Sequence, residues 1–319
     1  MEVLTLTPTN TPAVKTFGAD LLRDFYAFLD VSPKTLSTYQ RAMRQVFKYF
    51  KERGISNPVH QDIADFKKAL EAKGRKAATI GLYLAACRRF FDWTEQAGIY
   101  ANIAKGVKSP KQERGHKRDY FGATQLKGIM QGMSRDTLQG MSRDTLQGKR
   151  DYAVFALMAT CGLRTIEISR ANIEDLRNLG DSTVLFVQGK GRKDRADFVK
   201  IPAPLLEAIN DYLTLRGNAP DDAPLFAGIG NRNRNGRMCT RTISQIAKRA
   251  MRAAGYNSRR LSAHSLRHSA VTLTLLAGKS LDEVQSFARH TNIATTQIYS
   301  HAVDRIRSTC EASIAAQIF

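Results

Sequence analysis

Residues 262–269 read SAHSLRHS, and this stretch places a histidine and an arginine three positions apart at the start of a predicted helix. At that spacing His264 and Arg267 lie on one face of the helix, whereas His268 points elsewhere and is expected to be structural. Polar residues of the same kinds recur on both sides: Arg164 in CGLRTIEI, Lys190 in QGKGRKDR, His290 in ARHTN and Tyr299 in TTQIYSH. Arginine, lysine and histidine suit the binding and protonation of a phosphodiester, and a tyrosine hydroxyl can attack its phosphorus.

The charge of the chain indicates a polyanionic partner. Two domains are expected because 319 residues exceed one core of usual size, and the formal net charge is +20. Residues 1–119 contain 21 Lys and Arg against 12 Asp and Glu, and the remainder contains 28 against 17. Both halves are therefore basic, as expected if nucleic acid contacts both, although a generally cationic soluble protein would show the same composition.

Other features of the composition narrow the class of protein. No C-x-x-C pair is present, and the spacing of the cysteines is typical of buried, reduced thiols in a cytoplasmic protein: Cys87, Cys161, Cys239 and Cys310. The first residues lack the basic start and apolar core of a signal peptide, and no apolar run reaches the length of a membrane span. Neither a carboxylate cluster for a metal nor a nucleotide-binding loop is present, so no cofactor is predicted.

The first part of the chain predicts a small helical domain at 18–107, after a loose arm at 1–17. Ser32 and Pro33 form a helix start, and apolar residues at helical spacing continue until Gly54. Further helices are expected near 17–29, 61–73 and 77–96. Basic residues on these helices are candidate DNA contacts, although a charged helix face is usually only solvated: Arg41, Arg44, Lys48 and Arg88.

Two segments stand apart from the predicted domains. Residues 108–119, KSPKQERGHKRD, predict an exposed basic linker, and the second domain follows at 120–319. The octapeptide MSRDTLQG occurs twice in succession, at 133–140 and 141–148. Eight residues match no helical period, and the glycines favour a surface loop between helices near 124–130 and from 151 onward. We expect that deletion of one copy preserves activity.

The second domain predicts several helices and one small β-hairpin. An apolar helix at 151–161 closes at Gly162, so Arg164 falls in a turn where an anion can meet it and where Glu167 can orient its guanidinium. Runs rich in Val, Phe and Ile predict the hairpin strands, and the glycine-rich tip between them holds Lys190, with Lys193 as the alternative: strands at 183–188 and 197–201.

The last third of the chain adds further helices. Thr240 is expected to cap a helix to Ala253, whose exposed side offers candidate DNA contacts: Arg241, Lys248 and Arg252. Ser280 and Glu283 form a capping box for the helix that ends before His290. The final residues 308–319 alternate small and apolar types and are expected to form a helix that docks on a neighbouring protomer, with packing on their own domain as the alternative.

In their order along the chain, GLRTIEI, GKGRKDR, HSLRH and TTQIYSH resemble the motifs of the tyrosine recombinase (phage integrase) family. The resemblance covers nearly the whole chain. It implies a helical, SAM-like core-binding domain followed by a mainly α catalytic domain with a small β-sheet (α+β). The layout resembles two-domain members of the Xer type more than lambda-type integrases, whose additional arm-site domain has little room here. One departure is Ala288-Arg289 before His290, where relatives often have Leu-Gly.

The resemblance also implies a role for each motif residue. Tyr299 is the nucleophile. The residues that bind phosphate or transfer protons are the paired arginines, the hairpin lysine and the two histidines: Arg164, Arg267, Lys190, His264 and His290.

The activity implied by the resemblance is site-specific DNA recombination through a 3′-phosphotyrosyl intermediate, without ATP or metal. Relatives exchange strands through a Holliday junction in a tetramer on specific core sites, and the tetramer can include a related recombinase. A type IB topoisomerase-like enzyme is one alternative, because it shares the chemistry but only relaxes supercoils. A DNA-binding regulator without activity is another, and a metal nuclease fits the motifs least well.

Overall fold

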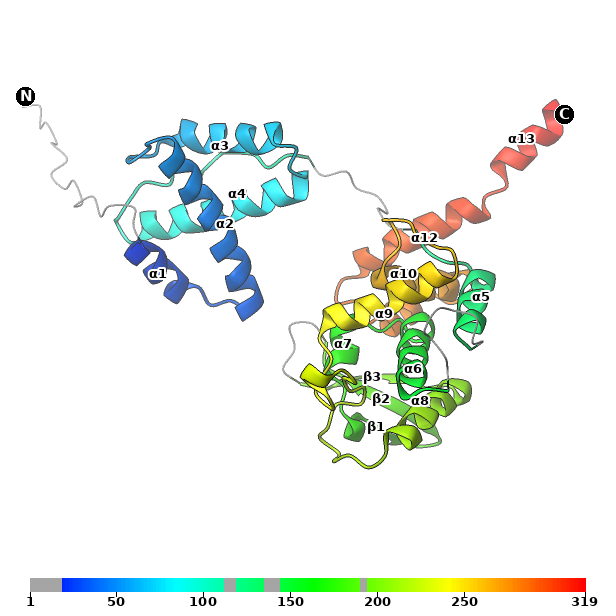
Figure 1. Ribbon diagram of the computed structural model, residues 1–319. Coiled ribbons are helices and arrows are strands. Elements are labelled where there is room, and N and C mark those ends of the chain that lie inside the picture. The colour runs from blue at the N-terminus through cyan, green and yellow to red at the C-terminus, as the bar shows by residue number, and fades with distance from the viewer. Residues whose placement is uncertain (1–18, 112–118, 135–143, 190–193) are drawn as a thin grey trace, which may run out of the picture. The chain divides into compact units, whose positions relative to one another are not determined.

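The computed structural model describes residues 19–111, 119–134, 144–189 and 194–319. Its internal contacts divide the chain into two compact units (Figure 1), Met1–Arg114 and Gly115–Phe319, which we call unit 1 and unit 2. The division falls within the basic segment that the sequence predicts as a linker. No helix in the described ranges is both long enough and apolar enough to cross a membrane.

Unit 1 consists of helices. Ser32 caps the second helix by accepting a hydrogen bond from the Thr35 amide at 3.3 Å, and Pro33 occupies its first turn, as predicted. A cluster of aromatic side chains fills the core, where the rings of Phe25 and Phe90 meet edge to face at 5.2 Å. The helices are α1 (Ala19–Phe28), α2 (Pro33–Glu52), α3 (His60–Ala72) and α4 (Ala77–Gln96).

Unit 2 is built around the buried helix α6 (Leu146–Thr160), which packs against α5, α8, α9 and α10. Its apolar run Ala153–Ala159 is buried throughout. A helix that is buried on all sides has apolar residues on every face, which explains the sequence of this run. The other helices and the two short 3-10 turns are α5 (Ala123–Ser134), α7 (Thr165–Arg170), η1 (Ile173–Asp175), α8 (Ala203–Arg216), η2 (Asn231–Asn233), α9 (Thr240–Ala253), α10 (Ala263–Leu276), α11 (Leu281–Ala288), α12 (Ile293–Arg307) and α13 (Cys310–Ile318).

The sheet of unit 2 has three antiparallel strands in the order β1-β2-β3, rather than the two predicted. Strands β2 (Ser182–Val187) and β3 (Asp197–Lys200) form the expected hairpin, with Val187 opposite Asp197. The additional strand is β1 (Leu176–Leu179), which pairs with the other edge of β2. Three of its four residues are exposed. The sequence LRNL therefore lacks the alternation of apolar and polar residues that predicts a half-buried strand. The predicted fold class, mainly α with a small sheet, is confirmed.

The repeated octapeptide extends beyond a loop, contrary to the prediction. Met133 and Ser134 of the first copy end α5, and Met133 is buried. In the second copy Thr145 caps α6 by accepting a hydrogen bond from the Gly148 amide at 3.0 Å. Residues 135–143 lie outside the described structure. The two copies therefore supply different helix ends, which local glycine content does not reveal.

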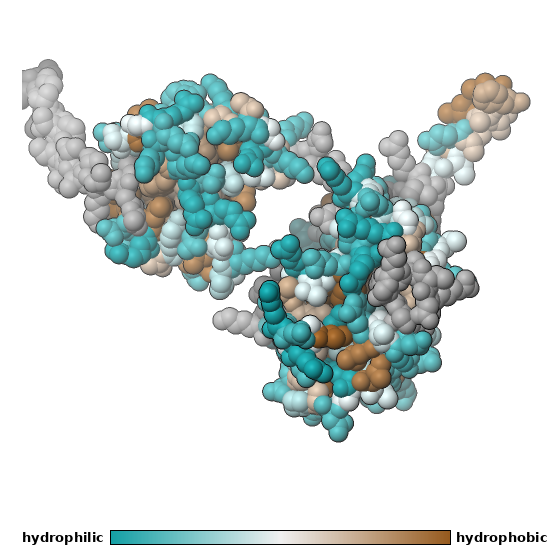
Figure 2. Space-filling view, viewed as in Figure 1, coloured by the Kyte–Doolittle hydropathy of each residue, from teal (hydrophilic) through white to brown (hydrophobic). Residues whose placement is uncertain are grey.

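The C-terminal helix α13 projects from the rest of unit 2 (Figure 1), and its apolar side chains face solvent (Figure 2). Ile314 is 56% exposed, Ile318 is 69% exposed, and Phe319 is fully exposed. Packing of α13 on its own domain, the alternative, is therefore not observed in the part of unit 2 that the structure describes. The expectation of four buried cysteines is also wrong, since Cys87 and Cys161 are buried whereas Cys239 and Cys310 are exposed.

Candidate active site

The site begins at the turn between α6 and α7. Gly162 adopts a left-handed backbone (φ 59°), which ends α6 and directs the chain into α7. Arg164 occupies the N-cap position of α7, and its Nη1 donates to Glu167 Oε1 at 2.7 Å while its amide donates to Oε2 at 2.8 Å. The Glu167 side chain is fully buried, whereas the Arg164 side chain is 29% exposed. The Glu167 carboxylate thus holds the Arg164 guanidinium, while part of the Arg164 side chain stays exposed.

Arg267 lies on α10 and is one of the most deeply buried side chains, with 1% exposure. Its Nη1 donates to the Gly162 carbonyl at 2.6 Å, and its Nη2 donates to the Ala288 carbonyl. These bonds join α10 to the α6–α7 turn and to the end of α11. Burial lowers the pKa of Arg267 to about 9, and the positive charges of Arg164 and Arg289 act in the same direction. The guanidinium therefore stays protonated at neutral pH.

Tyr299 lies on α12, and its ring packs among apolar side chains of α10, α11 and α12. Burial raises the pKa of its phenol above the ordinary value, although Arg267 and Arg164 act in the opposite direction. The phenol is buried but lies within electrostatic reach of both guanidinium groups. Three segments that are far apart in sequence thus bring two arginines and a tyrosine together.

His268 is part of this arrangement, contrary to the expectation that it points elsewhere. Its ring lies 4.7 Å from the Tyr299 ring and stacks on Tyr120 at 5.4 Å. Its Nδ1 is 3.2 Å from the Thr272 hydroxyl. The side chain is buried and packs against the Tyr299 ring, which agrees with the expectation of a structural residue. Sequence spacing missed this contact because Tyr299 approaches from a different helix.

The two motif histidines have different environments. His290 is buried, its Nδ1 lies 2.9 Å from the Thr296 hydroxyl, and its ring stacks against Tyr299 at 6.1 Å. Burial and the nearby arginines lower the pKa of His290 to about 4, so its imidazole is neutral at pH 7. His264 is exposed, although it lies one turn from buried Arg267 on the same helix.

Arg289 takes the position where relatives often have glycine, and its backbone is left-handed (φ 52°, ψ 47°). This conformation costs a non-glycine residue roughly 1–2 kcal/mol. Arg289 follows α11, whose start has the predicted capping box: the Ser280 hydroxyl accepts a hydrogen bond from the Glu283 amide at 3.2 Å. The side chain of Arg289 turns inward, and its Nη2 donates to Glu167 Oε2 at 3.1 Å. The departure from glycine is visible in the sequence, whereas the contact of this guanidinium with Glu167 is visible only in the structure.

Lys190 and Lys193 lie outside the described residues. The described ends of the hairpin loop are nevertheless anchored. On one side, Arg170 of α7 donates to the Gly189 carbonyl at 3.1 Å. On the other side, Arg195 donates to Asp175 at 2.7 Å. Gly189, the last described residue before this segment, therefore lies beside the helix that follows Arg164.

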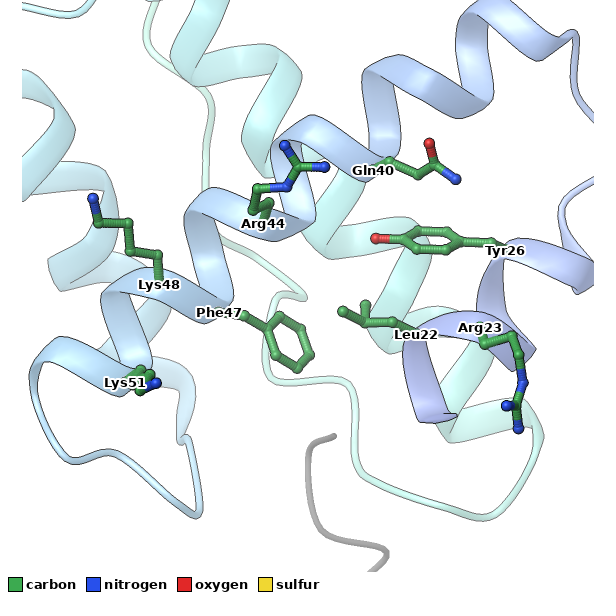
Figure 3. Close-up of a pocket in the computed structure, with 8 residues that line it drawn as sticks. All are labelled: Leu22, Arg23, Tyr26, Gln40, Arg44, Phe47, Lys48 and Lys51. Atoms are coloured by element: carbon green, nitrogen blue, oxygen red, sulfur yellow. The ribbon is translucent and has the colours of Figure 1, made fainter. Parts of the chain in front are cut away.

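A basic face on α2 is the candidate DNA surface of unit 1. Arg41, Arg44 and Lys48 are all exposed on this helix. A groove of about 790 Å³ runs between α1 and α2, and Figure 3 shows Leu22 and Phe47 facing one another in it with Arg44 and Lys48 along its edge. An apolar floor beneath a basic edge suits contacts to a sugar-phosphate backbone and to base edges.

Arg88 does not share this face. It is half-buried, and it donates to the Val107 carbonyl at 3.0 Å and to the Ser109 hydroxyl at 3.1 Å, which ties α4 to the segment after it. These bonds fix the position of the Arg88 side chain within unit 1, and its contact with DNA stays a prediction.

The predicted contacts on α9 also differ among themselves. Cys239, not Thr240, is the N-cap residue. Lys248 donates to the carbonyls of Ser258 and Leu261 at 2.6 and 3.1 Å, so its ammonium group is already bonded to backbone. Arg241 and Arg252 are exposed, and Arg252 contacts Asn257 at 3.0 Å.

No group of three or more His, Cys, Asp and Glu side chains in the described ranges is arranged to hold a metal ion. The site instead consists of guanidinium groups, imidazoles and one phenol around a turn. Such a set can bind an anionic phosphorus centre, stabilise charge on its oxygens and supply an oxygen nucleophile.

Comparison with known proteins identifies the class. Residues 121–305, more than half of the chain, match the Phage integrase family, and residues 22–98 match the Phage integrase, N-terminal SAM-like domain. The chain therefore belongs to the phage integrase family, and it is a site-specific recombinase of the tyrosine type.

Among its relatives are Xer recombinases. The chain is 31% identical over 277 residues to tyrosine recombinase XerC of Escherichia coli O157:H7, covering 85% of this chain and 86% of that protein. It is 32% identical over 277 residues to XerC of Mannheimia succiniciproducens, covering 85% and 87%. The fold is similar to that of XerH site-specific recombinase bound to a palindromic difH substrate (TM-score 0.72, 21% identity, 88% and 80% covered). It is also similar to a lambda integrase tetramer bound to a Holliday junction (TM-score 0.65, 17% identity, 88% and 76% covered).

Proposed function

We propose that this protein cuts and rejoins DNA at specific core sites through a covalent bond between Tyr299 and the 3′ phosphate. The observation that carries the proposal is the convergence of Arg164, Arg267 and Tyr299 from α7, α10 and α12. Membership of the phage integrase family supports it. A cytoplasmic location remains a prediction from the sequence.

In the proposed step the Tyr299 oxygen forms a bond to phosphorus as the bond from phosphorus to the 5′ oxygen breaks. Arg164 and Arg267 donate to the non-bridging oxygens. The departing 5′ oxygen takes a proton from Lys190, the proposed general acid. One phosphoester replaces another, so bond energy is approximately conserved and the reaction needs neither ATP nor a metal. The free 5′ hydroxyl of a second strand reverses the step and rejoins the DNA.

The two motif histidines have different proposed roles. A buried phenol with a raised pKa needs a base, and we assign this role to His264, which is exposed and next to the site. His290 is neutral, and its Nδ1 is next to Thr296, so its other ring nitrogen is proposed to form a hydrogen bond with a phosphate oxygen.

We further propose that strand exchange takes place in a tetramer through a Holliday junction, because one site cuts one strand and two duplexes have four. A related recombinase can replace some of the protomers in this assembly. The exposed helix α13 is the proposed link between protomers. A groove of about 540 Å³ between α5, α6 and α10, lined by Leu126, Met130 and Leu273 among others, offers an apolar surface of matching chemistry on a neighbour.

Removal of residues 308–319 tests the assembly. The truncated chain should bind a single core site as wild type does, but it should form paired-site complexes and recombinants more slowly. Gel-shift assays with one and two sites separate these effects. Unchanged recombination would contradict the docking role.

A suicide substrate tests the chemistry. A core site is first selected from a pool of randomised duplexes and then nicked next to the scissile phosphate, so that the cut strand end diffuses away. Wild type should accumulate a covalent protein–DNA adduct, and Tyr299→Phe should form none while it binds the same DNA. A DNA-binding regulator would form no adduct, and a metal nuclease would still cut as Tyr299→Phe. A topoisomerase-like enzyme would form the adduct without pairing two sites.

A further inference from the structure

Arg289 places a third guanidinium in the interior beside the arginine pair. Its side chain is 6% exposed, with Nη2 donating to Glu167 Oε2 at 3.1 Å and Nη1 donating to the Phe287 carbonyl at 2.8 Å. The Nε has no hydrogen-bond partner within the described structure. A left-handed backbone and a buried donor without a partner are both unfavourable, so packing alone does not account for this arginine.

The Glu167 carboxylate is shared between two arginines. Oε1 accepts from Arg164 Nη1, and Oε2 accepts from Arg289 Nη2. Burial would raise the pKa of Glu167, but Arg289 and Arg164 lower it below its ordinary value, so the carboxylate is ionised. With Arg267 included, three guanidinium groups and one carboxylate leave two net positive charges. Without Arg289, the same cluster would have one.

We propose that Arg289 is a positioning residue that acts through Glu167 and keeps the phosphate-binding cluster at two net positive charges. Glu167 can then hold Arg164 in place without neutralising the site. This inference rests on the proposed function, because the charge matters only if a phosphodiester reacts beside it.

Two net positive charges balance the negative charge of the proposed transition state, whereas they exceed the negative charge at the scissile phosphate of the bound DNA. A phosphodiester has one negative charge at the scissile phosphorus, and addition of a phenolate brings a second before the 5′ oxygen leaves. An interaction that is stronger in the transition state than in the ground state raises the rate more than the affinity. Loss of Arg289 should therefore slow cleavage while DNA binding changes little.

The experiment compares Arg289→Met with Arg289→Lys. Both side chains resemble arginine in length, and both place a non-glycine residue in the left-handed region, so they differ in the ammonium group, with its charge and its hydrogen-bond donors. The single-turnover rate of adduct formation is measured at saturating enzyme on the nicked suicide duplex. Arg289→Met should be slower than wild type by about 10- to 100-fold, whereas Arg289→Lys should stay within about fivefold. Affinity for the intact site should change by less than about threefold in both variants.

A second substrate separates charge from structure. A methylphosphonate at the scissile position removes one negative charge from both the bound DNA and the transition state. On this substrate Arg289→Met and wild type should differ by less than about threefold, because one net positive charge now suffices. An equal loss on both substrates, or a loss of affinity as large as the loss of rate, would overturn the inference.

Two other outcomes, an unfolded Arg289→Met variant and a wild type without adduct, also give an answer. If Arg289→Met unfolds, Arg289→Gly replaces it, since glycine adopts the left-handed backbone without strain and also removes the charge. The same dependence on substrate is then expected, and its absence would again overturn the inference. If wild type itself forms no adduct on the normal phosphodiester, the proposed function fails before Arg289 is tested.

Discussion

The two units of this protein hold their positive charges in opposite ways. In unit 2, Arg267 is buried and donates to the carbonyls of Gly162 and Ala288. In unit 1, Arg44 and Lys48 stand exposed on α2. A buried cation is stable only where partners fix it, which suits chemistry at one phosphate. Exposed cations contribute additively and are screened by salt, which suits holding a long polyanion.

The largest expected effect tests the buried charges. Arg267→Lys should slow adduct formation by about 100- to 1,000-fold, because one ammonium group cannot donate to two carbonyls and a phosphate in the geometry of a guanidinium. Single-turnover rates on the suicide substrate measure the loss. DNA affinity should change far less than the rate. A variant that is folded and cleaves at the wild-type rate would contradict the proposed role.

The exposed cations of α2 should contribute to DNA affinity and not to the cleavage rate. Replacing Arg41, Arg44 and Lys48 together by Gln should reduce the slope of log K against log salt by about 3. The rate at saturating enzyme should remain that of wild type. A matched control replaces Lys68, Lys73 and Arg75, which are also exposed in unit 1 but not on α2, and its slope should stay closer to wild type. An equal change in both triple variants would remove α2 from the proposed DNA surface.

A smaller effect comes from the neutral imidazole of His290. Its pKa is about 4 in the folded protein, below the ordinary value, because of burial and the neighbouring arginines. Between roughly pH 6.5 and pH 4 the unfolded chain binds a proton that the folded chain does not. The free energy of unfolding of unit 2 should therefore decrease as the pH falls through this range. Denaturant titrations of wild type and His290→Asn should diverge there, and parallel curves would contradict the assignment.

The smallest effect concerns the repeated octapeptide. Deletion of residues 141–148 leaves one copy, whose Met and Ser can still end α5 and whose Thr can still cap α6. Recombination should remain at the wild-type level, and the unfolding free energy should change by no more than about 1 kcal/mol, as expected for a shorter connection. Failure of the shortened protein to fold would show that both copies are required.

Local sequence predicted most of the elements that surround the site. Ser32 with Pro33, Ser280 with Glu283, and Gly162 each mark a helix boundary by a local hydrogen bond or a local backbone preference, and each prediction was confirmed. Strand β1 was missed because its exposed LRNL sequence has no apolar alternation. The hydrogen bonds from Arg88 and Lys248 to backbone carbonyls were not predicted, because helical periodicity gives no information about carbonyls that are distant in sequence.

The sequence by itself determined the class of protein, because the motifs around Arg164, Arg267 and Tyr299 specify both residue type and order. Only the tertiary structure decided how these charges are balanced. It brought His268 against Tyr299, turned Arg289 inward to share Glu167, and left the side chains of α13 exposed. The physical reason is that spacing along one helix sets which face a residue occupies. Burial, pKa and ion pairing depend on groups that other helices bring to that face.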